Sequence, residues 1–90
     1  MKEYEEEIII RMLEAGYILS TYAPVERVAS VINWDELATK HKVRKGIKSV
    51  FRSLKAKGLI TDHGKSLRVV SLTKEGVRMA LALKMRKNKP

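Results

Sequence analysis

The sequence predicts a mainly helical domain with one small β-hairpin, and three observations lead to this prediction. The chain has 90 residues and no cysteine, which is the length of one small domain without a disulfide framework. In its middle, apolar residues recur at helical spacing at Ile47, Val50, Phe51 and Leu54. After the turn-forming stretch DHGKS, residues 67–73 are rich in β-branched side chains, which is typical of the second strand of a hairpin.

The first helix is predicted at residues 3–20. Glu residues crowd its first turn, where the helix dipole favours negative charge. Ile9, Met12 and Leu13 share one face at helical spacing, and Ile8 lies off that face. The helix therefore carries more apolar surface than the core of a single small domain needs.

The segment of residues 25–32 has two interpretations. Its β-branched residues favour a short strand, which we place near residues 30–32. Its apolar spacing also fits a helical turn that begins after Pro24, because proline is well tolerated at the first position of a helix.

A second helix is predicted at residues 34–41. Asn33 stands at its N-cap position and Glu36 follows three residues later, which together form a capping-box pattern. Trp34 begins the apolar face of this helix, and we expect its large aromatic ring to be an anchor of the core.

The third helix is predicted at residues 43–57 and has the strongest apolar periodicity in the chain. Gly58 follows it at the position where a glycine commonly ends a helix. Gly46 lies near its start, where the glycine either allows a close approach of another group or marks the beginning of the helix.

A hairpin is predicted at residues 59–72, and a last helix at residues 74–87. Gly64 lies in the turn of the hairpin. Thr73 stands at the N-cap of the last helix, where its hydroxyl can accept a hydrogen bond from a free backbone N–H group. All these elements belong to a single domain of residues 1–90.

The charge of the chain is unevenly distributed along the sequence. The formal net charge is +9; residues 1–36 carry eight acidic and three basic side chains, whereas residues 37–90 carry sixteen basic and two acidic ones. A small domain with one strongly positive part commonly binds a polyanion, and nucleic acid is the usual one. The alternative, general solubility, favours charges of both signs that are interspersed.

The stretch LATKHKVRKGIKSVFRSLKAKGLI, residues 37–60, resembles the winged helix-turn-helix of transcription regulators. A short helix with Leu-Ala, a turn, a helix with spaced apolar residues and the entry Gly-Leu-Ile into a hairpin follow one another in that family. The closing SLTKEG, residues 71–76, is similar to the junction between wing and helix in MarR-like and PadR-like regulators. The resemblance implies a winged helix-turn-helix with extra N- and C-terminal helices. Its 43–57 helix would enter the major groove of double-stranded DNA, and the 62–68 wing would lie on the adjacent backbone or minor groove.

The predicted DNA-binding residues are basic or small, and they lie on the third helix opposite its apolar stripe, in the turn before it, or on the hairpin. They are Lys40, Lys42, Arg44, Lys45, Lys48, Ser49, Arg52, Lys55, Lys65 and Arg68. Arg and Lys donate hydrogen bonds to guanine edges or to phosphates, and small residues let the helix approach closely. A solvated amphipathic helix is the alternative, but such helices usually mix Glu with Lys, and no acidic residue occurs between Thr39 and Thr61.

A homodimer is the expected assembly, because the first and last helices carry surplus apolar residues and small dimers read palindromic sites. The predicted dimer residues are Ile8, Met12, Val77, Leu81 and Leu83. Dimerisation through terminal helices is also what the resemblance to MarR-like and PadR-like proteins implies.

Two further functions remain open from the sequence. The protein could coat or segregate DNA with little specificity, because lysine outnumbers arginine on the basic face and acts mainly as a point charge. It could also be a protein-interaction subunit of the same fold, although partner surfaces are usually poor in lysine. An enzyme is not expected, since no Cys nucleophile, Gly-rich phosphate-binding loop or ligand cluster is present, and His41 and His63 lack a second ligand at metal spacing.

No cofactor, metal or effector is predicted from these residues. The acidic N-terminus is not a secretory signal, and no apolar run is long enough to span a membrane, so a cytoplasmic, nucleoid-associated protein is expected. The chain has no Gln and two Asn, a composition that is typical of thermophilic proteins.

Overall fold

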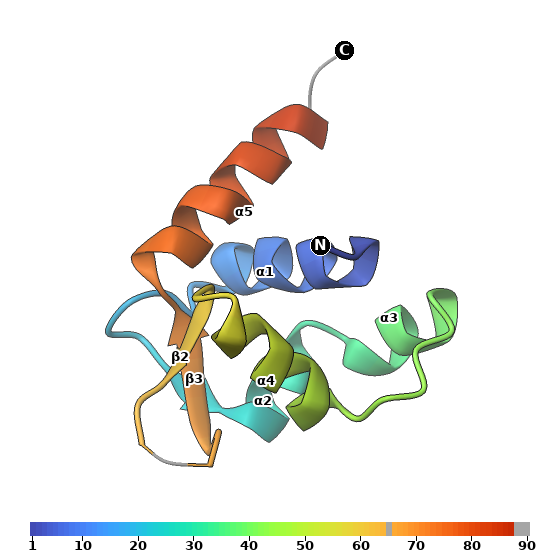
Figure 1. Ribbon diagram of the computed structural model, residues 1–90, viewed down its shortest axis with the longest axis horizontal. Coiled ribbons are helices and arrows are strands. Elements are labelled where there is room, and N and C mark those ends of the chain that lie inside the picture. The colour runs from blue at the N-terminus through green and yellow to red at the C-terminus, as the bar shows by residue number, and fades with distance from the viewer. Residues whose placement is uncertain (65, 88–90) are drawn as a thin grey trace.

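The computed structural model describes residues 1–64 and 66–87, and it is mainly helical with a small three-stranded antiparallel sheet (Figure 1). In chain order the elements are α1 (Glu3–Ala15), β1 (Ala23–Pro24), α2 (Val25–Val31), α3 (Trp34–Lys40), α4 (Ile47–Ala56), β2 (Ile60–Asp62), β3 (Val69–Leu72) and α5 (Lys74–Lys87). The strands are ordered β1-β3-β2, so the hairpin β2–β3 gains a third, short strand from the N-terminal part of the chain.

Helix α1 runs through the middle of the protein, with α5 on one side and α4 on the other (Figure 1). Ile8, Ile9 and Met12 are fully buried, and Ile10 is 6% exposed. The apolar surface that looked surplus in the sequence is therefore covered by other elements of the same chain. This position explains why α1 is apolar on more than one face.

Helix α1 ends at Ala15, so the predicted helix of residues 3–20 is too long. Gly16 adopts the left-handed conformation (φ 85°), and its N–H donates to the Leu13 carbonyl oxygen at 3.1 Å. The chain then runs irregularly toward the sheet, where the Leu19 N–H donates to the Leu72 carbonyl oxygen at 2.8 Å. The loop is thereby attached to the C-terminal end of β3.

The predicted strand near residues 30–32 is wrong, because this segment belongs to α2. Val25 and Val28 lie one helical turn apart, and both are buried. Burial of one helical face outweighs the β-preference of the branched side chains, which is a weak, context-dependent effect. The strand lies immediately before the helix instead, where Ala23 pairs with Val70.

Helix α3 was predicted to within one residue, since it ends at Lys40 with His41 as its C-cap. The predicted capping box is absent, because Asn33 has a left-handed backbone (φ 57°) and its side chain caps no N–H group. Glu36 accepts a hydrogen bond from Arg11 at 3.2 Å instead. Trp34 is 9% exposed, as expected of a core residue.

Helix α4 begins at Ile47, four residues later than predicted, and Gly46 is its N-cap. Residues 43–46 form an irregular link that is held by the Val43 N–H, which donates to the Ala38 carbonyl oxygen at 2.8 Å. Gly46 thus marks the start of the helix. At the other end Gly58 has φ 76°, which confirms its predicted position just after the helix.

The hairpin and the last helix are confirmed, although the strands are shorter than residues 59–72. Ile60 pairs with Leu72 at the base of the hairpin. The Thr73 hydroxyl accepts a hydrogen bond from the Gly76 N–H at 3.0 Å, as the N-cap prediction requires. It also donates to the Gly58 carbonyl oxygen at 2.6 Å, and this bond ties the start of α5 to the end of α4.

A buried carboxylate joins α1 to the end of α4. Glu5 is 2% exposed and accepts hydrogen bonds from the Lys2 backbone N–H, the Ser53 hydroxyl and the Lys57 ammonium, the last at 2.9 Å. Burial alone raises the pKa of this carboxyl. The hydrogen bond and charge of Lys57, together with the other two donors, outweigh burial and hold the pKa below its ordinary value of 4.5.

This lowered pKa predicts a pH-dependent contribution to stability. A carboxyl with a depressed pKa in the folded state stabilises the fold above its unfolded pKa, and the stabilisation is lost as the pH falls through the folded value. We expect Glu5→Gln to lower the free energy of unfolding by about 1–3 kcal/mol at neutral pH, and the difference from the native protein to shrink in acid. Urea denaturation at neutral pH and near pH 3 measures both values, with Glu3→Gln as the exposed control. A difference that is equally large in acid would contradict the assignment.

Candidate nucleic-acid interface

The side of α4 that points away from the core carries basic side chains together with two small residues. Val50, Phe51 and Leu54 are buried against the core. The exposed residues of the helix are Lys48, Ser49, Arg52, Lys55 and Ala56. The structure therefore brings together, on one exposed side of α4, the predicted DNA-binding residues that belong to this helix.

Ion pairs divide the bases of this region into two groups. Lys55 Nζ lies 2.9 Å from Asp62 Oδ1, and Lys57 Nζ lies 2.9 Å from Glu5 Oε1. Among the residues that the structure describes, Lys48 and Arg52 have no ion pair and no side-chain hydrogen bond. Lys48 and Arg52 are thus the helix bases whose donors are available to an external anion or base edge.

Asp62 attaches the hairpin to α4. Its side chain is 8% exposed and accepts hydrogen bonds from Lys55 and, at 3.3 Å, from the Leu67 N–H. The hydrogen bond from Lys55 outweighs the effect of burial and lowers the pKa of Asp62. Lys55, which was predicted to be a DNA-binding residue, is 48% exposed and forms this ion pair with β2.

A shallow groove of about 280 Å³ separates α4 from the sheet and α2. Lys48 of α4 and Arg68, next to β3, both line it, with Pro24, Glu26 and Val69 as the other lining residues. Two predicted DNA-binding residues that are twenty positions apart thus share one groove. Lys65, the other base predicted on the hairpin, lies outside the described residues.

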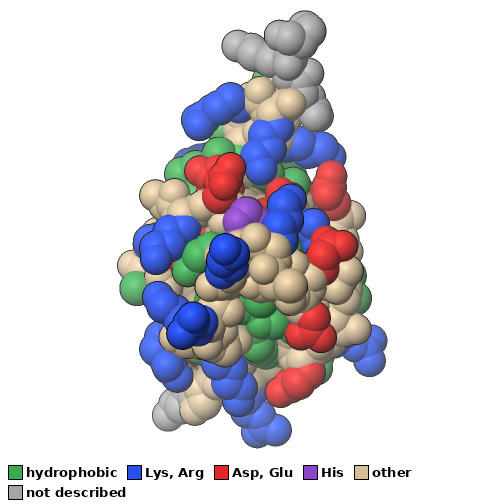
Figure 2. All heavy atoms as spheres, turned by 90° about the vertical axis from the view of Figure 1, so that its right-hand side faces the viewer, with side chains coloured by type: hydrophobic (Ala, Val, Ile, Leu, Met, Phe, Trp, Pro, Cys, Tyr) green, Lys and Arg blue, Asp and Glu red, His purple; other side chains and the backbone are tan. Residues whose placement is uncertain are grey.

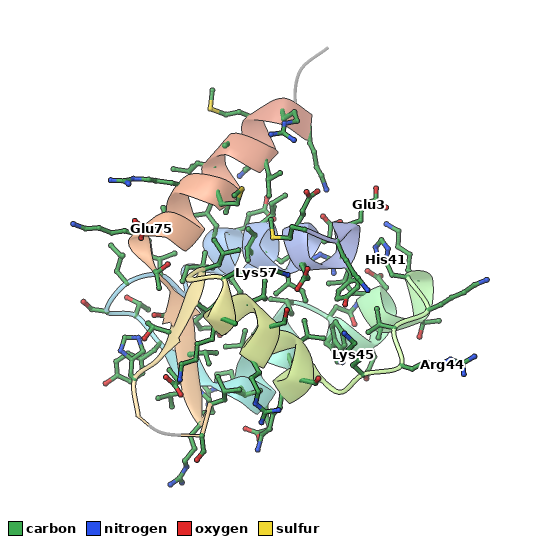
Figure 3. The ribbon with its side chains drawn as sticks, in the orientation of Figure 1. Glu3, His41, Arg44, Lys45, Lys57 and Glu75 are labelled. Carbon is green, nitrogen blue, oxygen red and sulfur yellow. The ribbon has the colours of Figure 1, made fainter. Side chains whose placement is uncertain are left out.

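The link between α3 and α4 presents a second group of bases. Lys40, Lys42, Arg44 and Lys45 are all exposed. The last three of these border a depression of about 430 Å³ next to the start of α1. Figure 3 shows Glu3 and His41 close together at that end of α1, with Arg44 extending away from the protein body. Lys45 precedes the helix, so its predicted position on the helical face itself is wrong, although it remains within two residues of Ile47.

Basic and acidic side chains are separated on the surface. Figure 2 shows Lys and Arg along one side and the lower edge of the face it presents, with further ones across its upper part, and most Asp and Glu toward the opposite side. This arrangement follows from the sequence, because the acidic residues concentrate in the first 36 positions and the basic ones in the rest. A protein with one positive side orients itself as it approaches a polyanion.

The predicted dimer residues do not form one surface. Ile8 and Met12 are fully buried in the core and Leu83 is 3% exposed, so the prediction is wrong for these three. They pack inside the chain because α5 lies against α1. Leu81 is 48% exposed and Val77 is partly buried.

The apolar surface that stays exposed on α5 consists of Leu81 together with two methionines that the sequence-based set omitted. Met79 is 38% exposed and Met85 is 70% exposed. A helical wheel would have indicated Met85, because Leu81 and Met85 are four residues apart and face away from buried Ala80 and Leu83. Met79 lies toward another side of the helix.

Comparison of the chain with protein-family models, with curated proteins and with solved structures gave no match. Within residues 1–64 and 66–87, no helix is both long and apolar enough to cross a membrane.

Proposed function

We propose that the protein binds double-stranded DNA as a winged helix-turn-helix domain, with α4 as the recognition helix and the β2–β3 hairpin as the wing. The order of helix, link, helix and hairpin, with a short strand that pairs beside the hairpin, supports this proposal. The observation that carries it is the exposed side of α4, where Lys48 and Arg52 have no partner among the described residues and small side chains lie between them.

The chemistry of this side suits the major groove. The groove admits an α-helix, and Lys and Arg donate to the guanine acceptors O6 and N7 or to phosphate oxygens. Ser49 and Ala56 are small, so the helix can approach the base edges. Arg68 contacts the DNA backbone beside the major groove. Lys40 and Lys42 lie where contacts to phosphates would fix the position of the domain along the duplex.

We infer a transcription regulator, and a DNA-coating protein is the second candidate. What favours the second is the lysine content of the exposed link and helix, because lysine acts mainly as a point charge and lacks the planar, two-pronged geometry of arginine. Selection from random duplexes at two salt concentrations separates the two. A regulator enriches one sequence at both concentrations, whereas a coating protein retains all sequences at low salt and loses them steeply as salt rises. Failure to retain any duplex at low salt would contradict DNA binding itself.

The proposed assembly is a homodimer that forms through the outer side of α5. Leu81 and Met85 are exposed there beside Arg78, and methionine and arginine are both enriched in protein interfaces. Helix α5 and helix α4 lie on opposite sides of α1 (Figure 1), so pairing through α5 leaves α4 free. Two copies would then present two recognition helices to a palindromic site.

We expect the double substitution Leu81→Glu and Met85→Glu to leave a folded monomer, because carboxylates would be desolvated in the interface. Analytical ultracentrifugation at tens of micromolar, free and on a duplex, measures the mass. Thr39→Glu, an exposed position on α3, is the control for added charge. A native protein that is monomeric in both conditions would contradict the dimer.

A further inference from the structure

The groove between α4, α2 and the sheet contains one acidic side chain among its basic ones. Glu26 lines it together with Lys48 and Arg68, and apolar surface from Pro24 and Val69 completes the lining. Glu26 is exposed, and within the described part of the chain it forms no ion pair with either base. A carboxylate at this place disfavours a phosphate group, because like charges repel strongly where water is displaced.

A role in helix stability does not by itself account for this position. Glu26 lies in the first turn of α2, where a negative charge is favoured by the helix dipole. Asp35 and Glu75 occupy the corresponding second positions of α3 and α5. Glu26 differs from both, because neither of them lines the groove that holds Lys48 and Arg68.

We propose that Glu26 and Lys48 together read a G·C base pair, and that Glu26 is thereby a specificity-determining residue of the domain. This inference rests on the proposed binding of DNA through α4. In the major groove a G·C pair presents the guanine acceptors O6 and N7 next to the cytosine N4 amino donor. Lys48 of α4 supplies the donor for the guanine and Glu26 of α2 supplies the acceptor for the cytosine, since both line one groove of about 280 Å³.

The same carboxylate acts against binding without sequence preference. A phosphate that enters the groove meets Glu26 as well as Lys48 and Arg68, so the attraction of the two bases is partly cancelled. Discrimination between partners commonly combines such a repulsive group with an attractive one. Glu26 therefore lowers the affinity for arbitrary duplexes. It also increases the ratio between the affinity for a duplex with a cytosine amino group at this position and the affinity for other duplexes.

The test compares Glu26→Gln with Glu75→Gln. Both changes remove one negative charge from the second position of a helix. Glu75 lies at the start of α5 (Figure 3) and does not line the groove. Each variant and the native protein are used for selection from random duplexes, and the enriched duplex is then titrated with G·C or A·T at the selected position. Thermal unfolding shows whether the two variants are equally stable.

The native protein and Glu75→Gln are expected to select G·C at one position and to bind that duplex about tenfold or more tightly than its A·T counterpart. Glu26→Gln is expected to weaken this preference, because the glutamine amide suits adenine better than cytosine, and to bind unselected duplexes about threefold or more tightly. If the native protein selects a sequence and Glu26→Gln behaves as Glu75→Gln does, the inference about Glu26 is overturned while DNA binding stands. If the native protein binds no duplex, DNA binding and the inference fall together.

Discussion

Replacement of Lys48 and Arg52 together by alanine is expected to weaken binding to duplex DNA by about thirtyfold or more, because each contact to a base edge or phosphate contributes about 1–3 kcal/mol. Both side chains are exposed and lie on the side of α4 that faces away from the buried Val50 and Leu54. Their removal disrupts no described ion pair, so the free energy of unfolding should stay nearly constant. Fluorescence anisotropy of a labelled duplex measures the affinity, and urea denaturation measures the stability.

The chain offers a closely matched control in Lys74 and Arg78. These residues are again a lysine and an arginine four positions apart on the exposed side of a helix, in this case α5. The double substitution to alanine removes the same charge from the protein as the change in α4. On a duplex that holds a single half-site, to which one protomer binds without the dimer contact through α5, it should reduce affinity only slightly, through the long-range field. An equal loss of affinity in both double variants would mean that total charge, and not the exposed side of α4, determines binding.

The substitution Gly76→Ala is expected to have the largest effect on stability, a loss of about 3 kcal/mol or more in the free energy of unfolding. An added Cβ at Gly76 would overlap the carbonyl oxygen of Leu59. That oxygen cannot move easily, because it accepts the Thr73 N–H at 3.1 Å at the junction between hairpin and α5. At an exposed helical position the same substitution would be stabilising, since alanine is favoured over glycine in helices.

Urea denaturation of Gly76→Ala tests this prediction, and Gly46→Ala is its control. No atom lies within 4 Å of a Cβ built at Gly46, whose φ of −72° is open to any residue. The control should therefore change stability by less than about 1 kcal/mol. A Gly76→Ala protein as stable as the native one would show that the close packing of α5 on Leu59 is not required.

Local patterns in the sequence were sufficient for the elements that depend on local physics. The core-facing stripe of α4, the cap at Thr73 and the helix end at Gly58 were all predicted, because each is determined by residues within a few positions of one another. Gly16 is an equally local indication, because a glycine commonly follows the last residue of a helix, and it would have ended α1 at Ala15. The apolar residues that continue after Gly16 made the helix look longer than it is.

Contacts between distant positions account for the remaining errors. The strand β1 has two residues and exists because Ala23 pairs with Val70, which no local pattern reveals. The burial of Ile8 and Met12 depends on which helix packs over them.

For the candidate site, the sequence located the exposed bases of α4 but not their partners. Glu5 and Lys57 form an ion pair although they are 52 positions apart in the sequence. Only the three-dimensional structure therefore shows that Lys57 is already paired. The position of Glu26 beside Lys48 and Arg68 likewise requires α2, α4 and β3 to be assembled.

Amide chemical shifts, followed by NMR as a duplex is added, test the use of α4 most directly. The largest changes are expected for the exposed residues of α4 and for Arg68, with small changes along the outer side of α5. The shift changes of these residues should fit one dissociation constant, and the affinity should fall as the salt concentration rises. Changes that are confined to α5, or a spectrum that stays the same at low salt, would contradict the proposal that α4 is the surface that binds DNA.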